Sequence, residues 1–244
     1  DPGEILDDPE VELVVEVMGG ETLAGDLMER ALRSGRSVVT ANKALLARRG
    51  AELLALAGAH RADLAFEAAV GGGIPIVRAL RDQLAGDRVQ RLVGILNGTS
   101  NYVLTQMTEH GQSFADALAD AQAKGYAEAD PTLDVDGYDA AHKLVVLAML
   151  AFGANVAAGQ LDVEGIRSLE AVDIEHAGRF GYAIKHLVVG ADHDDALELR
   201  AHPALVPRSS VLANVSGVLN AVALTGEALG PCFLSGRGAG DLPT

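Results

Sequence analysis

The chain has 244 residues, of which 49% are hydrophobic, so it can bury a substantial core as one large domain or two smaller ones. Its 19 Lys and Arg residues face 34 Asp and Glu residues, which gives a formal net charge of -15. This charge opposes contact with phosphate backbones and anionic lipid surfaces, so nucleic-acid and membrane partners are not expected. Cys232 is the only cysteine, which excludes an intrachain disulfide and suits a reducing, cytoplasmic compartment.

Strand and helix patterns alternate from the start of the chain to about residue 65. Apolar, β-branched runs and helical spacing predict strands at 11–19, 37–42 and 64–70 and helices at 22–35 and 44–60. This alternation is typical of a parallel sheet in a doubly wound, Rossmann-type domain. The only run resembling a phosphate-binding glycine loop, GRGAG at 236–240, lies at the opposite end from these elements. We therefore expect a fragment that lacks both the N-terminal GxGxxG part and the C-terminal end of a longer protein.

The remainder of the chain has a mixed pattern. Periodicity and turn residues predict helices at 74–86, 102–111, 113–125 and 139–153, a strand at 88–96, and polar loops at 97–101 and 126–138. Residues 160–235 are expected to alternate short strands and helices, and residues 236–244 form a glycine-rich turn.

The densest polar cluster lies in GYAEADPTLDVDGYDAAHKL, residues 125–144. Asp139 and Lys143 are four residues apart on the helix predicted there, so their side chains share one face. Both the helix N-terminus and the apolar run that follows disfavour a charged amine at Lys143, so this lysine could serve as a general acid or base. An ordinary surface ion pair beside solvated carboxylates explains the same spacing.

Three further segments have a functional and a purely structural interpretation. Lys43 follows a predicted strand, where open α/β sheets bind ligands, but it could equally be a surface lysine that starts a helix. Glu67 precedes three glycines, which could expose carbonyls to a cation or amides to an anion, or could simply form a tight turn. The NGTSN segment at 97–101 has the same ambiguity. The seven histidines have no metal-ligand spacing, and Cys232 is expected to be buried and unreactive.

Taken together, these segments resemble the homoserine dehydrogenase family. The resemblance rests on four blocks in the family's order, VVTANKALLA (38–47), FEAAVGGGIPIV (66–77), GILNGTSNYVLTQM (94–107) and GYAEADPTLDVDGYDAAHKL (125–144). It continues through the C-terminal third to GRGAGDLPT at 236–244, and the block at 125–144 is the most specific.

The resemblance implies interconversion of L-homoserine and L-aspartate 4-semialdehyde with NAD or NADP, in threonine and methionine biosynthesis. Lys143 would donate and accept the proton, and Lys43 would assist beside the nicotinamide. The substrate would be held by Asp139 and Glu128, with Asp134 nearby. The other implied sites are backbone contacts of Gly125 with substrate or cofactor, a cofactor contact at Gly240, and a monovalent-cation site, such as one for sodium, at Glu67, Val70, Gly72 and Ile74.

The implied domains are a partial NAD(P)-binding Rossmann-type domain at 1–65, an α/β catalytic domain at 66–236 that also forms a homodimer interface, and a return to the nucleotide-binding domain at 237–244. Two alternatives stay open. Another amino-acid dehydrogenase of the aspartate or saccharopine type would lack the block at 125–144. A non-catalytic binding or regulatory chain would be expected to lose Lys143, Asp139, Glu128 or Lys43, all of which are present.

Overall fold

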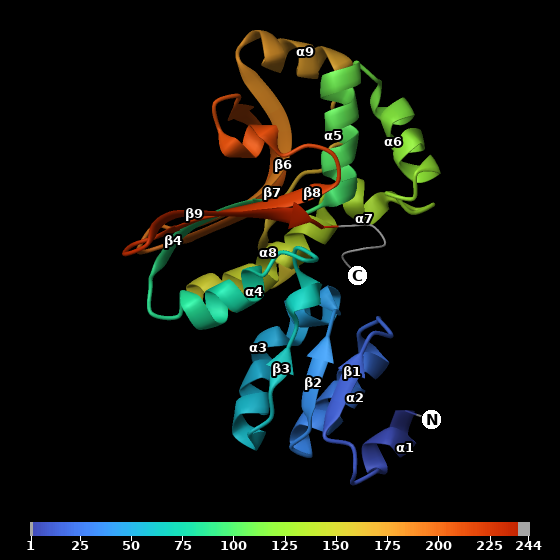
Figure 1. The fold of residues 1–244 in the computed structure, drawn as a ribbon, viewed down its shortest axis with the longest axis vertical. Coiled ribbons are helices and arrows are strands. Elements are labelled where there is room, and N and C mark those ends of the chain that lie inside the picture. Colours follow the sequence, from blue (N-terminus) through green and yellow to red (C-terminus); the bar gives the residue numbers. More distant parts are fainter. Residues whose placement is uncertain (1, 239–244) are drawn as a thin grey trace.

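The computed structural model describes residues 2–238 and contains two β-sheets that share one hydrophobic core (Figure 1). The first is a parallel sheet of order β1-β2-β3, formed by Leu13–Glu16, Ser37–Thr40 and Leu64–Ala65. The second has the order β5-β7-β6-β4-β8-β9 and is antiparallel except where β5 pairs with β7. This combination is the α/β fold with a partial Rossmann-type sheet that the sequence predicts.

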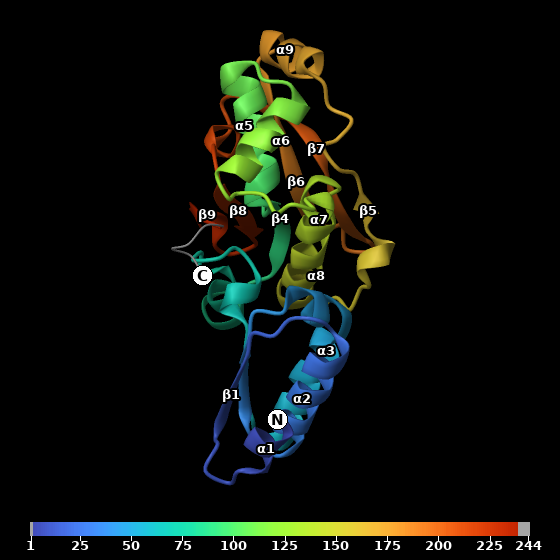
Figure 2. The same cartoon turned by 90° about the vertical axis from the view of Figure 1, so that its right-hand side faces the viewer.

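Helices cover one face of the parallel sheet (Figure 2). They are α2 (Thr22–Arg33) and α3 (Lys43–His60), with α1 (Pro2–Asp7) beside α2. The helix α2 is amphipathic because Met28, Ala31 and Leu32 recur on one face and are buried against the sheet. On β1, Val14 points to this core, whereas Leu13 and Val15 point to the opposite face and are exposed.

The predicted strand at 64–70 is wrong beyond Ala65. Residues Glu67–Ala69 form a 3₁₀ turn, η1, and the chain then reverses through Gly71 and Gly72, whose φ values of 78° and 59° favour glycine. Phe66 and Val70 are nevertheless fully buried. The apolar run therefore reflects burial in the core and not an extended backbone.

The six-stranded sheet also differs from the expectation for residues 160–235. The strands are β4 (Val89–Ile95), β5 (Asp162–Val163), β6 (Tyr182–Asp192), β7 (Leu197–Pro207), β8 (Leu219–Gly226) and β9 (Gly230–Arg237). Only one α-helix, α9 (Ala171–Arg179), lies in this region, together with the short turn η4 (Val211–Asn214). Pro203 does not end β7, because β5 pairs with β7 only at Arg200 and Ala201 and leaves the edge at Pro203 unpaired.

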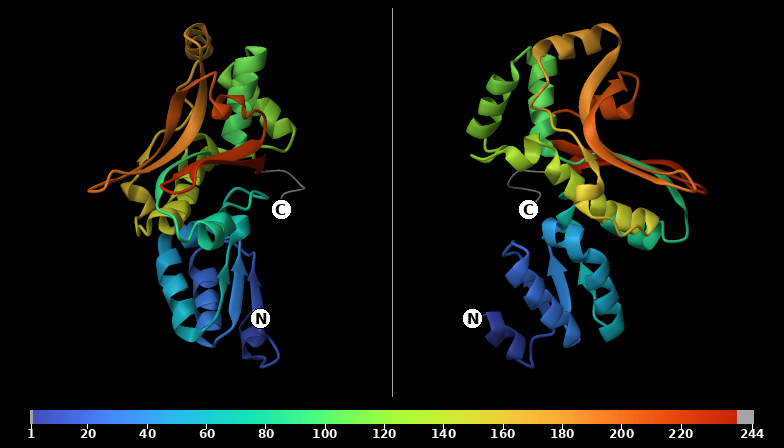
Figure 3. Two further views of the ribbon diagram at one scale, coloured as in Figure 1. Left: turned by 60° about the vertical axis from the view of Figure 1, so that its left-hand side comes forward. Right: turned by 180° about the vertical axis from the view of Figure 1, so that it is seen from behind.

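The helices on this sheet bring the polar segments together. They are α5 (Gly98–His110), α6 (Phe114–Ala123), α7 (Thr132–Val135) and α8 (Tyr138–Phe152), and Figure 3 shows α5 and α6 side by side. The helix predicted at 139–153 is confirmed as α8. The predicted loop at 126–138 contains the short helix α7, and the helix predicted at 74–86 divides into α4 (Ile76–Arg78) and a π-helical turn, η2 (Ala79–Gln83).

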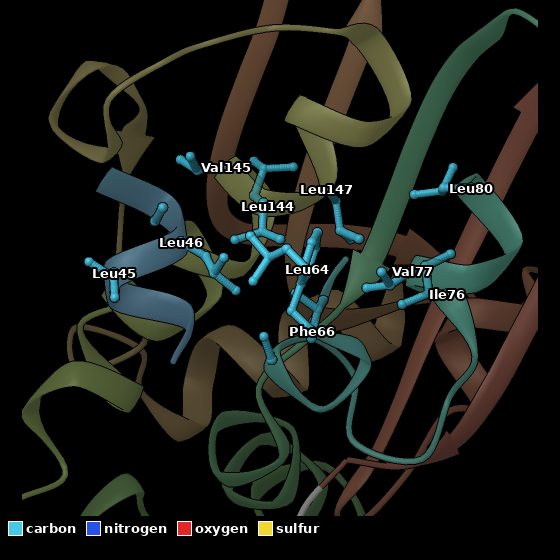
Figure 4. Packing of buried hydrophobic residues seen from close by; sticks show 14 of the residues in the cluster. Leu45, Leu46, Leu64, Phe66, Ile76, Val77, Leu80, Leu144, Val145 and Leu147 are labelled. Atoms are coloured by element: carbon cyan, nitrogen blue, oxygen red, sulfur yellow. The ribbon is translucent and has the colours of Figure 1, made fainter. Parts of the chain in front are cut away.

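The core joins the two sheets through α3 and α8. Figure 4 shows Leu46 of α3 and Leu144 of α8 close to Leu64 and Phe66, and all four are buried. Each such side chain contributes roughly 1.5–3 kcal/mol when it is removed from water. The helix-sheet layers therefore hold the start of α3 close to α8. Across residues 2–238, no helix combines the length and apolar character needed to cross a membrane.

A first prediction concerns Gly165, whose backbone packs directly on the end of α7. A Cβ at this position would overlap the carbonyl oxygen of Val135 and the Cα of Asp136, which are backbone atoms that cannot move alone. We expect Gly165→Ala to lower the free energy of unfolding by about 1–3 kcal/mol. Urea denaturation followed by circular dichroism measures the change.

Gly159→Ala is the matched control, because an added Cβ at Gly159 meets open space. It should leave the unfolding midpoint nearly unchanged. Equal midpoints for Gly165→Ala and the wild type would show that residues 164–166 do not pack on α7 as described.

Candidate active site

Asp139 lies in the first turn of α8, at the junction of the two sheets, and is only 6% exposed. Its Oδ2 accepts a hydrogen bond from Lys143 Nζ at 2.6 Å, one turn further along the helix. Its Oδ1 lies 3.2 Å from Nζ of Lys43, the first residue of α3. Two lysines, Lys43 after the end of β2 and Lys143 on α8, therefore contact one carboxylate.

Asn97 holds this carboxylate from a third element. Its Nδ2 donates to Asp139 Oδ2 at 2.9 Å and to Asp134 Oδ1 at 2.7 Å, and its Oδ1 accepts from the amide of Ser100 at 2.7 Å. Asn97 is thus the N-cap of α5, and the polar loop predicted at 97–101 is wrong because these residues form the cap and first turn of a helix. Asp134 consequently joins the lysine-carboxylate cluster.

The surroundings of the two carboxylates shift their pKa values in opposite directions. Burial alone would raise the pKa of Asp139, but the charges of Lys143 and Lys43, with hydrogen bonds from Lys143 and Asn97, lower it to about 2. Burial raises the pKa of Asp134, and the charge of Asp139 adds to this rise against the hydrogen bond from Asn97. Asp139 is therefore ionised at neutral pH.

The Lys143 amine is held by two acceptors, Asp139 Oδ2 and the carbonyl oxygen of Leu96 at 2.7 Å. Burial distinguishes this pair from an ordinary helix ion pair: its side chains are 13% and 8% exposed, against 50% and 28% for the similarly spaced pair Lys124 and Asp120. An amine with two of its three positions fixed can direct the third toward a bound molecule. The arrangement suits proton transfer at that position.

Gly125 and Glu128 lie near the start of α5 but outside the cluster. Thr99 Oγ1 donates to the carbonyl of Tyr126 at 2.6 Å, which ties this segment to the first turn of α5. Glu128 is exposed, and no residue of the described range 2–238 forms a hydrogen bond or ion pair with its carboxylate. The roles of Gly125 and Glu128 stay predictions.

The segment expected to hold a cation forms a compact turn beside the end of β9. The carboxylate of Glu67 caps α4 by accepting from the amides of Val77 at 3.1 Å and Arg78 at 2.9 Å. The Ile74 carbonyl accepts from Ile76. Among residues 2–238 no backbone donor faces the carbonyls of Val70 and Gly72. Backbone oxygens, and not the Glu67 side chain, are therefore the atoms of this turn that are available as cation ligands. Gly240 lies outside the described residues.

Sequence reasoning missed Glu16, a buried carboxylate at the end of β1. It accepts from Thr40 Oγ1 at 2.7 Å and from the amides of Met18 and Gly19 at 2.9 and 3.1 Å. The carboxyl ends of β1 and β2 are thereby joined beside Lys43. The available signal was an acidic residue within the apolar run VELVVEVMGG at 11–20, which ends in Gly-Gly.

A buried lysine on β6 lies beside Asn101 of α5 and the chain that enters β8. Lys185 Nζ donates to the Val215 carbonyl at 2.7 Å, and Asn101 Nδ2 donates to the carbonyls of Val215, Gly217 and Leu219 at 3.0–3.1 Å. The chain entering β8 is fixed by these bonds. Burial lowers the pKa of Lys185 to about 8, and the charge of Glu109 partly opposes this.

A second prediction follows from Lys185. Because the folded-state pKa is below the usual value for lysine, the unfolded chain binds more protons between about pH 8 and 10.5, and stability rises with pH across that window. From pH 7 to pH 10 the wild type should gain about 2 kcal/mol relative to Lys185→Met. Urea denaturation of both proteins at the two pH values measures this difference, and a pH-independent difference would contradict it.

A separate apolar hollow of about 700 Å³ lies between α9 and the paired strands β6 and β7. Leu169, Phe180, Tyr182 and Leu205 contribute to its lining, and it contains neither Lys143 nor Asp139. Its lining also includes Glu164, Asp173 and His176, and it is separate from the lysine-carboxylate cluster.

Two family models match the chain. The model described as homoserine dehydrogenase matches residues 75–244, and the homoserine dehydrogenase NAD binding domain matches residues 1–67. The homoserine dehydrogenase of Pseudomonas aeruginosa is 50% identical over 97% of this chain and 54% of its own length. That of Neisseria gonorrhoeae is 47% identical over 100% of this chain and 56% of its own length.

Solved structures agree with these matches. A homoserine dehydrogenase from Thiobacillus denitrificans superposes with a TM-score of 0.96 at 46% identity, covering 100% of this chain and 56% of that one. A hyperthermophilic archaeal homoserine dehydrogenase in complex with NADPH gives 0.83 at 28% identity, covering 98% and 70%. The chain thus spans about half the length of the curated relatives it matches, and it belongs to the homoserine dehydrogenase family.

Proposed function

We propose that the full-length protein interconverts L-homoserine and L-aspartate 4-semialdehyde with NAD or NADP, as part of threonine and methionine biosynthesis. The observation that carries the proposal is the buried carboxylate of Asp139, which holds Lys143 at 2.6 Å and Lys43 at 3.2 Å. The names of the matched relatives support the substrate, and the NADPH complex of the archaeal relative supports the cofactor class.

In this proposal the neutral Lys143 amine takes the proton of the homoserine hydroxyl during oxidation, and the charged form returns it during reduction. A bound nicotinamide supplies the hydride acceptor or donor at the carbon that bears this oxygen. Asp139 keeps the Lys143 amine in place and stabilises its charged form after proton uptake. Lys43, which is 41% exposed and follows the end of β2, lies beside the nicotinamide in this proposal and assists the transfer.

The remaining contacts are proposed as follows. Glu128 and Asp134 hold the substrate's polar groups, and backbone atoms of Gly125 contact substrate or cofactor. Gly240 contacts the cofactor. A monovalent cation such as sodium binds the turn of Glu67, Val70, Gly72 and Ile74 mainly through backbone oxygens, which suits a hard, weakly charged ion.

We further propose that residues 1–65 belong to the NAD(P)-binding domain, 66–236 form the catalytic domain, and 237–244 begin a return to the NAD(P)-binding domain. The protein would act as a cytoplasmic homodimer. The experiment that tests the function measures L-homoserine-dependent reduction of NAD and NADP by the full-length protein, followed through nicotinamide absorbance. No reduction with either cofactor would overturn the proposal.

A third prediction tests the role of Lys143. Lys143→Met keeps the apolar stem and removes the amine, so kcat should fall by about 10²–10⁴-fold, the range expected for a general acid or base. Steady-state kinetics of the full-length protein with homoserine measures the loss. Lys124→Met is the control, because Lys124 forms the exposed pair of the same spacing with Asp120. A comparable loss in both variants would remove the case for proton transfer by Lys143.

A fourth prediction separates binding from chemistry at Glu128. If its carboxylate binds the substrate, Glu128→Leu should raise KM for homoserine about tenfold or more, as expected for a lost charged hydrogen bond. KM for the cofactor should stay the same. The matched control is Glu175→Leu, on the exposed face of α9. An unchanged KM for homoserine would show that Glu128 does not bind it.

A further inference from the structure

Asn220 is a buried polar residue on β8 that the proposed reaction does not yet use. Its side chain is fully inaccessible, and its backbone pairs with Gly236 of β9. Its Nδ2 donates to the carbonyl oxygen of Leu96 at 3.2 Å. That carbonyl also accepts from Lys143 Nζ at 2.7 Å. Asn220 and the proposed acid-base lysine therefore share one acceptor.

This shared acceptor restricts the Lys143 amine. A carbonyl oxygen has two lone pairs, and two donors fill both of them. The amide of Asn220 thus fixes the direction in which the Leu96 carbonyl receives Lys143. Because Asp139 fixes a second position of the amine, only the third remains to meet a substrate oxygen.

The other end of the carboxamide is unusual. Asn220 Oδ1 is buried and has no hydrogen-bond partner within the described part of the chain. The backbone of Gly238 lies directly against the carboxamide, so that an added Cβ there would overlap it. The carboxamide is therefore held between the carbonyl oxygen of Leu96 and the backbone of Gly238, which restricts its orientation.

We propose that Asn220 is a positioning residue, which orients the Lys143 amine through the Leu96 carbonyl. The inference rests on the proposed function, because it assigns a task within the same proton transfer. It requires that loss of the Asn220 amide slows turnover without weakening the binding of homoserine or cofactor.

The test compares Asn220→Leu with the wild type in the full-length protein. Leucine keeps the approximate volume and removes the donor, so kcat should fall about tenfold or more through misplacement of the amine. KM for homoserine and Kd for NADPH should remain unchanged. Asn214→Leu, the same change at an exposed position in η4, is the control. Equal kcat values for Asn220→Leu and the wild type would overturn the inference.

A double-mutant cycle distinguishes positioning from general structural damage. In the Lys143→Met background, Asn220→Leu should cause no further loss of kcat, because the amine that it positions is already absent. If kcat of the double variant falls by the product of the two single-variant losses, the inference is overturned. If Asn220→Leu does not fold, Asn220→Ser, which is too short to reach Leu96, takes its place in the same cycle. Absence of turnover in the wild type would instead count against the proposed function.

Discussion

The structure depends on burying one negative charge at the junction of its two sheets. An unpaired carboxylate at the position of Asp139 would cost several kcal/mol, and its ordinary response would be to take up a proton. Here Lys143, Lys43 and Asn97 come from α8, α3 and the cap of α5, and together they keep it ionised with a pKa of about 2. The relative positions of α8, α3 and α5 are therefore fixed in part by their contacts with the Asp139 carboxylate.

The hydrophobic core makes this coupling possible. The buried leucines of α3 and α8 bring the end of a parallel strand to the start of a helix on a different sheet. Apolar packing is not directional, so it sets the distance between the elements but not the orientation of polar atoms. The orientation comes from two asparagines at the start of α5. Asn97, the N-cap, binds Asp139 and Asp134, and Asn101, in the first turn, binds the chain that enters β8.

Local sequence patterns predicted the parts of the site that lie within one element. The spacing of Asp139 and Lys143 on a helix was sufficient to place them on one face, and Lys43 was recognised at the end of a strand. The meeting of Lys43 with Asp139 depends on the packing of two distant helices, so no local pattern reports it. The α/β fold followed from the alternation of strand and helix patterns up to residue 65, and the family from the blocks at 38–47, 66–77, 94–107 and 125–144.

The wrong predictions at 97–101 and 64–70 have a common physical origin, because both assigned a backbone conformation from side-chain polarity. Polar residues at 97–101 resemble a loop, yet Asn97 caps a helix, where a side-chain oxygen replaces a missing backbone acceptor. Apolar residues at 64–70 resemble a strand, yet burial of Phe66 and Val70 requires only that their side chains face the core.

Neutral amides are suited to hold the charges of this site. A lysine or arginine in place of Asn97 or Asn220 would also donate hydrogen bonds, but its charge would act on Asp139 and on the Lys143 amine together. An asparagine fixes direction while leaving the balance between the carboxylates and the two lysines nearly unchanged. The electrostatics of the cluster can then be set by Asp139, Asp134, Lys43 and Lys143, and its geometry by the amides that surround them.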